Sequence, residues 1–298
     1  MDSGYPQSMR VVGVIPGGGN GERMAPLPSS KELLPLGFRA TPRGPRPKVI
    51  ANYLIDALRE AGVDQVYWLI DRSKTDILQY FGSGAEVGVQ LAYVPTEASP
   101  SIVHTLDNAR GFLGDAQVLF GFPDIVFEPV HALRALRQRL SQGRADVVLA
   151  ALPAPPEQIA DRVVVDATGR ALSVLVKPVD GSGSDAWVLA AWAPSFTAFL
   201  ERWLLARASL ASATLQAASP EPYLGHVLQA AIVAGLSIEV ETFQLGSFID
   251  VGTSEGFASA VRRYGEVGLA PDALSTRAAP PAEHPTRSSH SEGRSSSR

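Results

Sequence analysis

The chain has 298 residues, of which 45% are hydrophobic and 19% charged, and its net charge is −4. This length suffices for one large domain or two small ones with an ample core. Cysteine is absent, which excludes disulfides, thiolate catalysis and Cys-ligated metals. The slightly acidic balance provides no basic field for nucleic acid. No apolar run approaches the about 20 residues needed to span a bilayer, and the N-terminus lacks the pattern of a signal peptide. We therefore expect a cytoplasmic enzyme.

The first element is a β-branched run at residues 11–15, which predicts a fully buried strand. A glycine-rich turn follows, and Arg23 and Lys31 come after it. Backbone N–H groups in such a turn can point together at an anion, so a polyphosphate site is predicted. A purely structural turn is the alternative, since the spacing fits neither G-x-G-x-x-G nor a P-loop. The turn consists of Gly17, Gly18, Gly19, Asn20 and Gly21.

From Gly18 to Pro26 the sequence reads GGNGERMAP, and KELLP follows at residues 31–35. This string resembles the signature of the sugar-nucleotide pyrophosphorylases, the nucleotidyltransferases related to glucose-1-phosphate thymidylyltransferase and UTP–glucose-1-phosphate uridylyltransferase. The resemblance implies an α/β fold of the nucleotide-diphospho-sugar transferase type, Rossmann-like, with a small β-rich sugar-binding portion. It also implies that Arg23 and Lys31 are catalytic and that the glycine turn binds the nucleotide.

The next segment, 37–48, is rich in proline, glycine and cations and is typical of a loop. The apolar spacing at 50–61 predicts an amphipathic helix. Strands and helices then alternate, which predicts a mainly parallel sheet covered by helices, with ligands at the carboxyl ends of its strands. We expect strands at 65–70, 87–94 and 116–122, and helices at 73–80 and 101–112.

Asp124 follows the strand at 116–122, where a carboxylate is costly unless it is exposed or paired. On the residues alone, a cap of the next turn explains it equally well. In the resembled family a strand ends in Gly-Asp here and the Asp binds Mg²⁺, whereas this chain has Pro123 before Asp124. The segment FIDVGT at 248–253 resembles the family's W-x-D-x-G-T, which implies that Asp250 is the second ligand of a Mg²⁺ cofactor. We therefore expect the two carboxylates to converge.

The second half of the sequence differs from the alternating strands and helices of the first. We expect a hairpin at 162–176, which resembles the family's sugar-binding part. There the second strand ends in Glu-Lys-Pro, with the Lys on the sugar phosphate; here Val176 replaces the glutamate and Lys177 is kept. An exposed strand-end lysine is the alternative. His226 stands where relatives carry an Asp. We expect strands at 146–152, 162–166, 172–176, 186–193 and a final pair at 237–243 and 245–249, with helices at 128–141, 195–206, 223–234 and 254–264.

We expect a single nucleotidyltransferase domain at 1–264, with a nucleotide-binding half at about 10–152 and a sugar-binding half at about 153–264. Residues 271–298 are rich in Ser, Pro and Arg and contain no aromatic side chain. Such a segment cannot bury enough apolar surface to offset its chain entropy, so a disordered tail is expected at 265–298.

The implied reaction joins a nucleoside triphosphate and a sugar 1-phosphate into an NDP-sugar with release of pyrophosphate. Those are the expected partners, without nucleic acid or membrane, and a homo-oligomer stays open. Two other hypotheses remain. One is a catalytically impaired regulatory or binding protein on the same fold, favoured by the lost glutamate. The other is a nucleotidyltransferase for a non-sugar phosphate or phosphonate. The residues do not select among dTTP, UTP and CTP.

Overall fold

The structure is a computed structural model that describes residues 9–19, 21–41, 43–96, 101–155, 158–180, 182–183, 185–214 and 222–266, the side chains of 210–214 excepted. Asn20 of the glycine turn and the predicted tail beyond residue 266 lie outside the described residues. No helix in the described part of the chain is long and apolar enough to cross a membrane.

Strands and helices alternate as the sequence predicts, and most lie within a few residues of their expected bounds. The strands are β1 (Val11–Gly17), β2 (Pro35–Arg39), β3 (Arg46–Val49), β4 (Gln65–Asp71), β5 (Gln90–Thr96), β6 (Gln117–Gly121), β7 (Ile125–Glu128), β8 (Val147–Pro153), β9 (Arg162–Val165), β10 (Ala171–Leu175), β11 (Asp185–Trp192), β12 (Ile238–Thr242) and β13 (Ser247–Asp250). The helices are α1 (Ala51–Glu60), α2 (Thr75–Phe81), α3 (Ile102–Asp107), α4 (Arg110–Leu113), α5 (Ala132–Leu140), α6 (Pro194–Thr214), α7 (Leu224–Val233) and α8 (Ser254–Tyr264), with short 3₁₀ turns η1 (Glu22–Met24), η2 (Lys31–Leu33) and η3 (Ala85–Val87).

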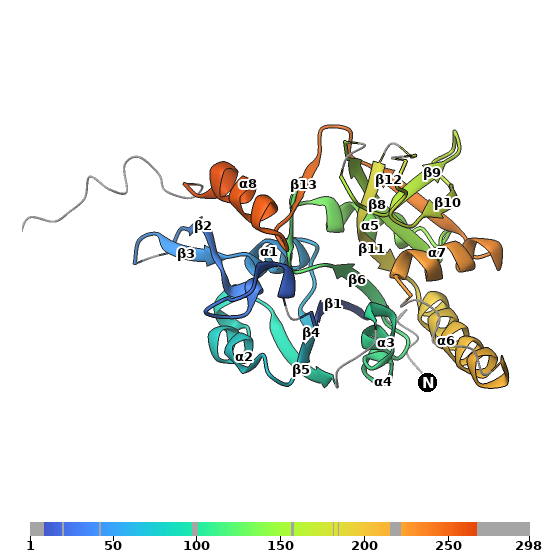
Figure 1. Ribbon diagram of the computed structural model, residues 1–298, viewed down its shortest axis with the longest axis horizontal. Coiled ribbons are helices and arrows are strands. Elements are labelled where there is room, and N and C mark those ends of the chain that lie inside the picture. Colours follow the sequence, from blue (N-terminus) through green and yellow to red (C-terminus); the bar gives the residue numbers. More distant parts are fainter. Residues whose placement is uncertain are drawn as a thin grey trace, which may run out of the picture.

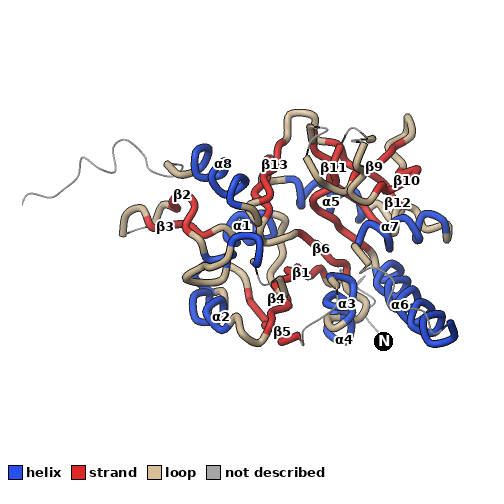
Figure 2. Tube along the Cα trace, in the orientation of Figure 1, coloured by secondary structure: helices blue, strands red, loops and turns tan. Residues whose placement is uncertain are grey.

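The main sheet has the strand order β10-β9-β11-β6-β1-β4-β5, and β8 joins it by pairing with β11 and β12. The pairs β6–β1, β1–β4, β4–β5 and β8–β12 are parallel, whereas β11 runs antiparallel to its neighbours. In Figure 1, β11 links β6 and its parallel neighbours β1, β4 and β5 to the group formed by β8, β9, β10 and β12. The predicted α/β, Rossmann-like fold, a mixed sheet with mainly parallel strands between helices, is therefore confirmed (Figure 2).

Two apolar layers cover the faces of this sheet. Alternate residues of β1 face opposite sides: Val12 and Val14 pack in one layer and Ile15 in the other, because successive side chains of a strand point to opposite faces. Helices α3, α4, α6 and α7 contribute to the first layer, and α1, α2 and α5 to the second. Burial of each Val or Ile contributes about 1.5–3 kcal/mol, so β1 is a firm base for the turn that follows it.

The segment predicted as a loop at 37–48 is instead largely a hairpin, β2–β3, which packs with α8 around a third apolar cluster. Proline predicts a loop because it would break a central strand, but both strands of a two-stranded sheet are edge strands, where proline is tolerated. Residues 125–128 also form an unexpected strand, β7, so α5 begins at Ala132 rather than at 128.

Three other features of the structure differ from the sequence-based predictions. The strand expected from residue 87 begins at Gln90, because Gly88 has φ +75 and ends the η3 turn. The helix expected at 101–112 is broken into α3 and α4. The last two strands do not pair with each other. Instead β12 lies parallel to β8, and β13 pairs with β7 in a separate sheet.

Candidate active site

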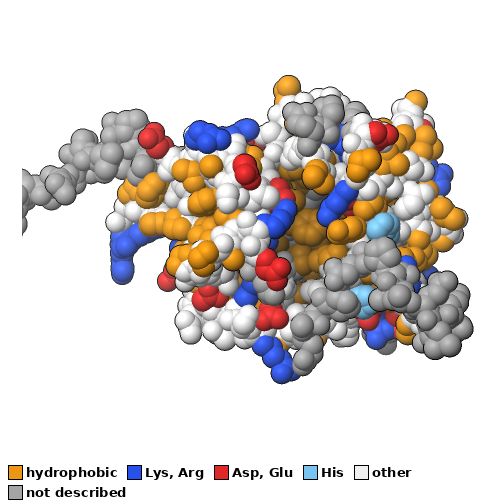
Figure 3. Space-filling model, viewed as in Figure 1, with side chains coloured by type: hydrophobic (Ala, Val, Ile, Leu, Met, Phe, Trp, Pro, Cys, Tyr) orange, Lys and Arg blue, Asp and Glu red, His pale blue; other side chains and the backbone are white. Residues whose placement is uncertain are grey.

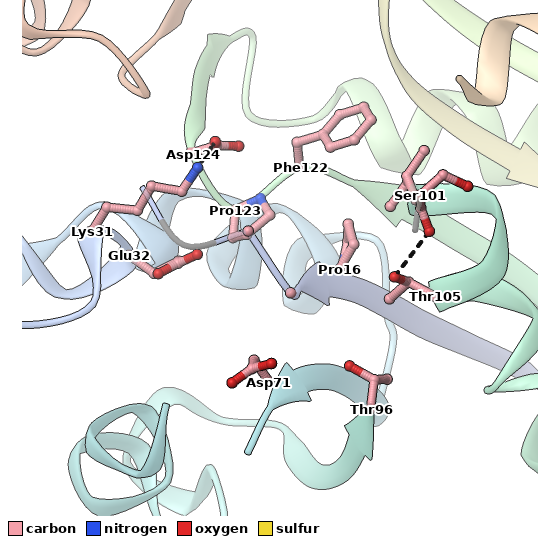
Figure 4. Close-up of a pocket in the computed structure, with 13 residues that line it drawn as sticks. Pro16, Lys31, Glu32, Asp71, Thr96, Ser101, Thr105, Phe122, Pro123 and Asp124 are labelled. Carbon is pink, nitrogen blue, oxygen red and sulfur yellow. Dashed lines mark hydrogen bonds and ion pairs between the residues drawn. The ribbon is translucent and has the colours of Figure 1, made fainter. Parts of the chain in front are cut away.

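A cavity of about 300 Å³ opens at the carboxyl edge of the parallel strands. Its walls come from the residues after β1, the ends of β4 and β5, the segment after β6, the η2 turn and the start of α3. Figure 4 shows Lys31 and Asp124 pointing toward each other at one side, and Asp71 and Thr96 at another. Ser101, which directly precedes α3, and Thr105 within α3 form a further part of the wall. This is the edge at which open parallel sheets bind ligands.

The glycines of the turn have two different reasons to be glycine. A Cβ at Gly17 would lie 2.7 Å from Trp68 Nε1, so packing requires its absence, and Gly21 has φ +67. Gly18 and Gly19 are different, because the nearest atom to a Cβ there, among described residues other than the adjoining ones, would lie 3.8 Å and 3.9 Å away, respectively. Both line the cavity. Their lack of side chains leaves the backbone accessible from the cavity.

Lys31 and Asp124 form a close ion pair across the cavity wall. Lys31 Nζ lies 2.5 Å from Asp124 Oδ2, and the side chains are only 13% and 16% exposed. Burial lowers the pKa of Lys31, but the neighbouring Asp124 carboxylate outweighs it, so the pKa is raised overall. Lys31 therefore keeps its charge at the cavity.

Asp250 reaches the same place from the far end of the chain. β13 pairs with β7 so that Asp250 lies opposite Ile125, and the Val251 N–H donates to the carbonyl of Asp124 at 2.9 Å. Asp250 Oδ1 accepts from the Gly252 N–H at 2.8 Å. Asp250 Oδ2 lies 3.7 Å from Nη2 of Arg23, an ion pair in which Arg23 is 64% exposed.

The two carboxylates and the Arg23 guanidinium converge beside Gly252. A Cβ built on Gly252 would lie 2.8 Å from Arg23 Nη2, 2.9 Å from Asp250 Oδ1 and 3.3 Å from Asp124 Oδ2. No group of three or more His, Asp or Glu side chains suited to a metal occurs among the described residues. Two carboxylates nevertheless suit Mg²⁺, which takes one or two from the protein and keeps waters and phosphate oxygens as further ligands. Asp124 and Asp250 therefore fit this cofactor.

The signature segment is tied to the α2 region by contacts that the sequence did not reveal. Ser30 donates to the Asp76 carboxylate from both its N–H and its hydroxyl, each at 2.7 Å. The next contact is buried: Lys74 Nζ donates to Glu32 Oε1 at 2.8 Å, with Glu32 only 1% exposed. Nothing in the KEL string singles out Glu32, because its partner lies in a different element. These contacts hold the backbone on both sides of Lys31.

Lys177 lies in the second half and is not among the residues that line the cavity. It has φ +43, and its ammonium sits 3.8 Å from the centre of the Tyr223 ring. Beside it lies Asp161, which sequence reasoning also missed. Burial raises the pKa of Asp161, and the charge of Lys177 opposes that rise. His226 accepts a hydrogen bond from the Tyr223 N–H through Nδ1 and so closes the start of α7.

Comparison with known proteins supports the resemblance noted from the signature. A glucose-1-phosphate thymidylyltransferase of Streptomyces griseus is 26% identical over 127 residues, which are 40% of this chain and 33% of that protein. The chain thus matches about a third of this curated relative. No family model matches.

Solved structures match over nearly the whole chain. A Bacillus anthracis structure described as a glucose-1-phosphate thymidylyltransferase in complex with sucrose superposes with a TM-score of 0.71 at 15% identity, covering 89% of this chain and 99% of its own. A UTP-bound UGPase from Acinetobacter baumannii gives 0.68 at 17% identity, covering 91% and 100%. The fold is therefore that of the sugar nucleotidyltransferases, and the sequence resembles theirs.

Proposed function

We propose that the chain is a Mg²⁺-dependent nucleotidyltransferase that joins a nucleoside triphosphate and a sugar 1-phosphate, releasing pyrophosphate. The observation that carries this proposal is the meeting of Lys31, Asp124, Arg23 and Asp250 beside the open glycine turn. The fold and the sequence similarity support it. The nucleotide-binding half is about 10–152 and the sugar-binding half about 153–264.

In this proposal the backbone of Gly18 and Gly19 and the side chain of Arg23 bind the triphosphate. Lys31 leaves Asp124 for the phosphates when the nucleotide enters, and so offsets the charge that grows on the leaving pyrophosphate. Asp124 and Asp250 would hold Mg²⁺, which would reduce the negative charge on the phosphate oxygens.

The acceptor is the phosphate of the sugar, which Lys177 would hold. One of its oxygens attacks the α-phosphorus, a new P–O bond forms, and the bond to the β-phosphate oxygen breaks. Two anions repel each other, so the cations of the site must first bring them into line. Positioning and charge neutralisation then supply most of the catalysis, without a covalent enzyme intermediate.

The similar proteins favour particular nucleoside triphosphates as the donor. One neighbour is described as UTP-bound and another protein is named a thymidylyltransferase, so a uridylyl or thymidylyl donor is the first expectation. Since nucleoside triphosphates are cytoplasmic metabolites, the reaction would take place in the cytoplasm.

A pyrophosphate-release panel tests the proposal. Each of dTTP, UTP, CTP, ATP and GTP is mixed with each of several sugar 1-phosphates, non-sugar phosphates and phosphonates, with Mg²⁺ or with EDTA. We expect release in at least one combination, lost with EDTA and strongly reduced in Asp250→Asn. Nucleotide binding without release in every combination would favour a regulatory protein on this fold. Release only with non-sugar phosphates or phosphonates would favour a different acceptor.

A further inference from the structure

Asp161 carries a carboxylate oxygen with no partner. Its Oδ1 is buried and makes no hydrogen bond within the described part of the structure. A buried acceptor that loses water without gaining a donor costs free energy, and native structures rarely tolerate it without a reason. Asp161 immediately precedes β9 and belongs to neither the metal site nor the glycine turn.

The other oxygen of Asp161 is held firmly. Backbone N–H groups of Lys177 and Gly225 donate hydrogen bonds to the carboxylate. A Cβ built on Gly225 would lie only 2.5 Å from Asp161 Oδ2. The side chain of Val176 reaches the same point, at 2.9 Å, and carries no polar atom. The carboxylate is thus fixed between the end of β10 and the start of α7, with Oδ1 left free.

The ammonium of Lys177 and the ring of His226 lie around this carboxylate. The charge of Lys177 favours the ionised form of Asp161 and opposes the effect of burial on its pKa. The ammonium of Lys177 lies over the Tyr223 ring, 3.8 Å from its centre. The group therefore presents one acceptor oxygen and one lysine that can turn to a phosphate.

Packing connects this group to the cavity. Phe122 lines the cavity, and its ring lies 6.3 Å from that of Trp187. The backbone N–H of Trp187 donates to the backbone carbonyl of Asp161 at 3.2 Å. Helix α3, which forms part of the cavity wall, also packs against α7. The space-filling view shows a hollow with an apolar floor on this face and charged side chains beside it (Figure 3).

We propose that Asp161 is a specificity-determining residue, whose free Oδ1 accepts a hydrogen bond from a ring hydroxyl of the sugar 1-phosphate held by Lys177. This inference rests on the proposed function. Charge selects the class of sugar. A uronic acid would set its carboxylate against that of Asp161, and like charges repel. The acceptor is therefore a sugar 1-phosphate whose ring carries no carboxylate.

The test separates the Michaelis constants of the two substrates in Asp161→Asn, which keeps the shape of the side chain and removes its charge. We expect the KM of the sugar phosphate to rise about ten- to hundredfold, the scale of a hydrogen bond to a charged group. The KM of the nucleotide should stay unchanged. Asp115→Asn is the matched control, since Asp115 is exposed and lies in the other half.

Monodeoxy sugar 1-phosphates identify the hydroxyl. One analogue should be poor with the wild type yet lose no further activity in Asp161→Asn, because both changes remove the same bond. If the wild type turns over but Asp161→Asn binds every analogue as the wild type does, the role of Asp161 is wrong while the proposed function stands. If the wild type shows no turnover, calorimetry with hexose 1-phosphates decides: binding that weakens in Asp161→Asn supports the contact, and equal or absent binding overturns it.

Discussion

The ion pair between Lys31 and Asp124 should stabilise the fold measurably. The atoms are 2.5 Å apart and the side chains 13% and 16% exposed, so the pair lies between two known cases. Exposed pairs contribute about 0.2–1 kcal/mol, whereas removing one partner of a fully buried pair costs about 3–5 kcal/mol. We expect Lys31→Met and Asp124→Asn each to lower the free energy of unfolding by about 2 kcal/mol.

The double variant decides whether the pair is the cause. It should be less destabilised than the sum of the single variants by about 2 kcal/mol, because it leaves no unpaired charge behind. The assay is urea unfolding of all four proteins. Arg134 and Glu60 provide a control pair at 3.2 Å, 50% and 30% exposed, for which we expect a coupling below about 1 kcal/mol. Equal coupling in the two pairs would refute the reasoning.

Three further variants test other parts of the account. Arg23→Ala should reduce turnover by about two to three orders of magnitude without changing the melting temperature, because the side chain is 64% exposed; near wild-type turnover would remove Arg23 from the mechanism. Arg162→Met should lower the free energy of unfolding by about 3 kcal/mol or more, because the buried guanidinium donates to the carbonyls of Ala154, Pro155, Gln158 and Gly183; urea unfolding beside an exposed control, Arg170→Met, measures it. Burial raises the pKa of Asp161 above the ordinary value of about 4, so the folded state holds this proton more tightly. The wild type should therefore lose stability relative to Asp161→Asn as the pH rises from about 4 through the raised value, and a pH-independent difference would contradict this.

The parts of the site that are formed by neighbouring residues in the sequence could be predicted. The strand at 11–15 is a local apolar run, and its turn follows in the same string, so both follow from neighbouring residues. The meeting of Asp124 and Asp250 depended on the family resemblance, because the β7–β13 pairing that joins them is only four residues long on each side.

Other features depend on partners that no local pattern reveals. Glu32 is buried because Lys74 lies beside it, and each is an ordinary surface residue by composition. Asp161 is held by backbone groups at residues 177 and 225, which come from two other elements. A charged residue whose partner lies far along the chain is indistinguishable in sequence from a solvated one.

The most direct test of the central claim is a ³¹P nuclear magnetic resonance spectrum of the reaction with Mg²⁺ and the best substrate pair from the panel. Attack on the α-phosphorus predicts inorganic pyrophosphate and a sugar nucleotide with two coupled diphosphate signals, in equal amounts. Formation of these products should fall by orders of magnitude in Asp124→Asn and in Asp250→Asn. A nucleoside diphosphate with a phosphorylated sugar, or unchanged product formation in both variants, would contradict the account.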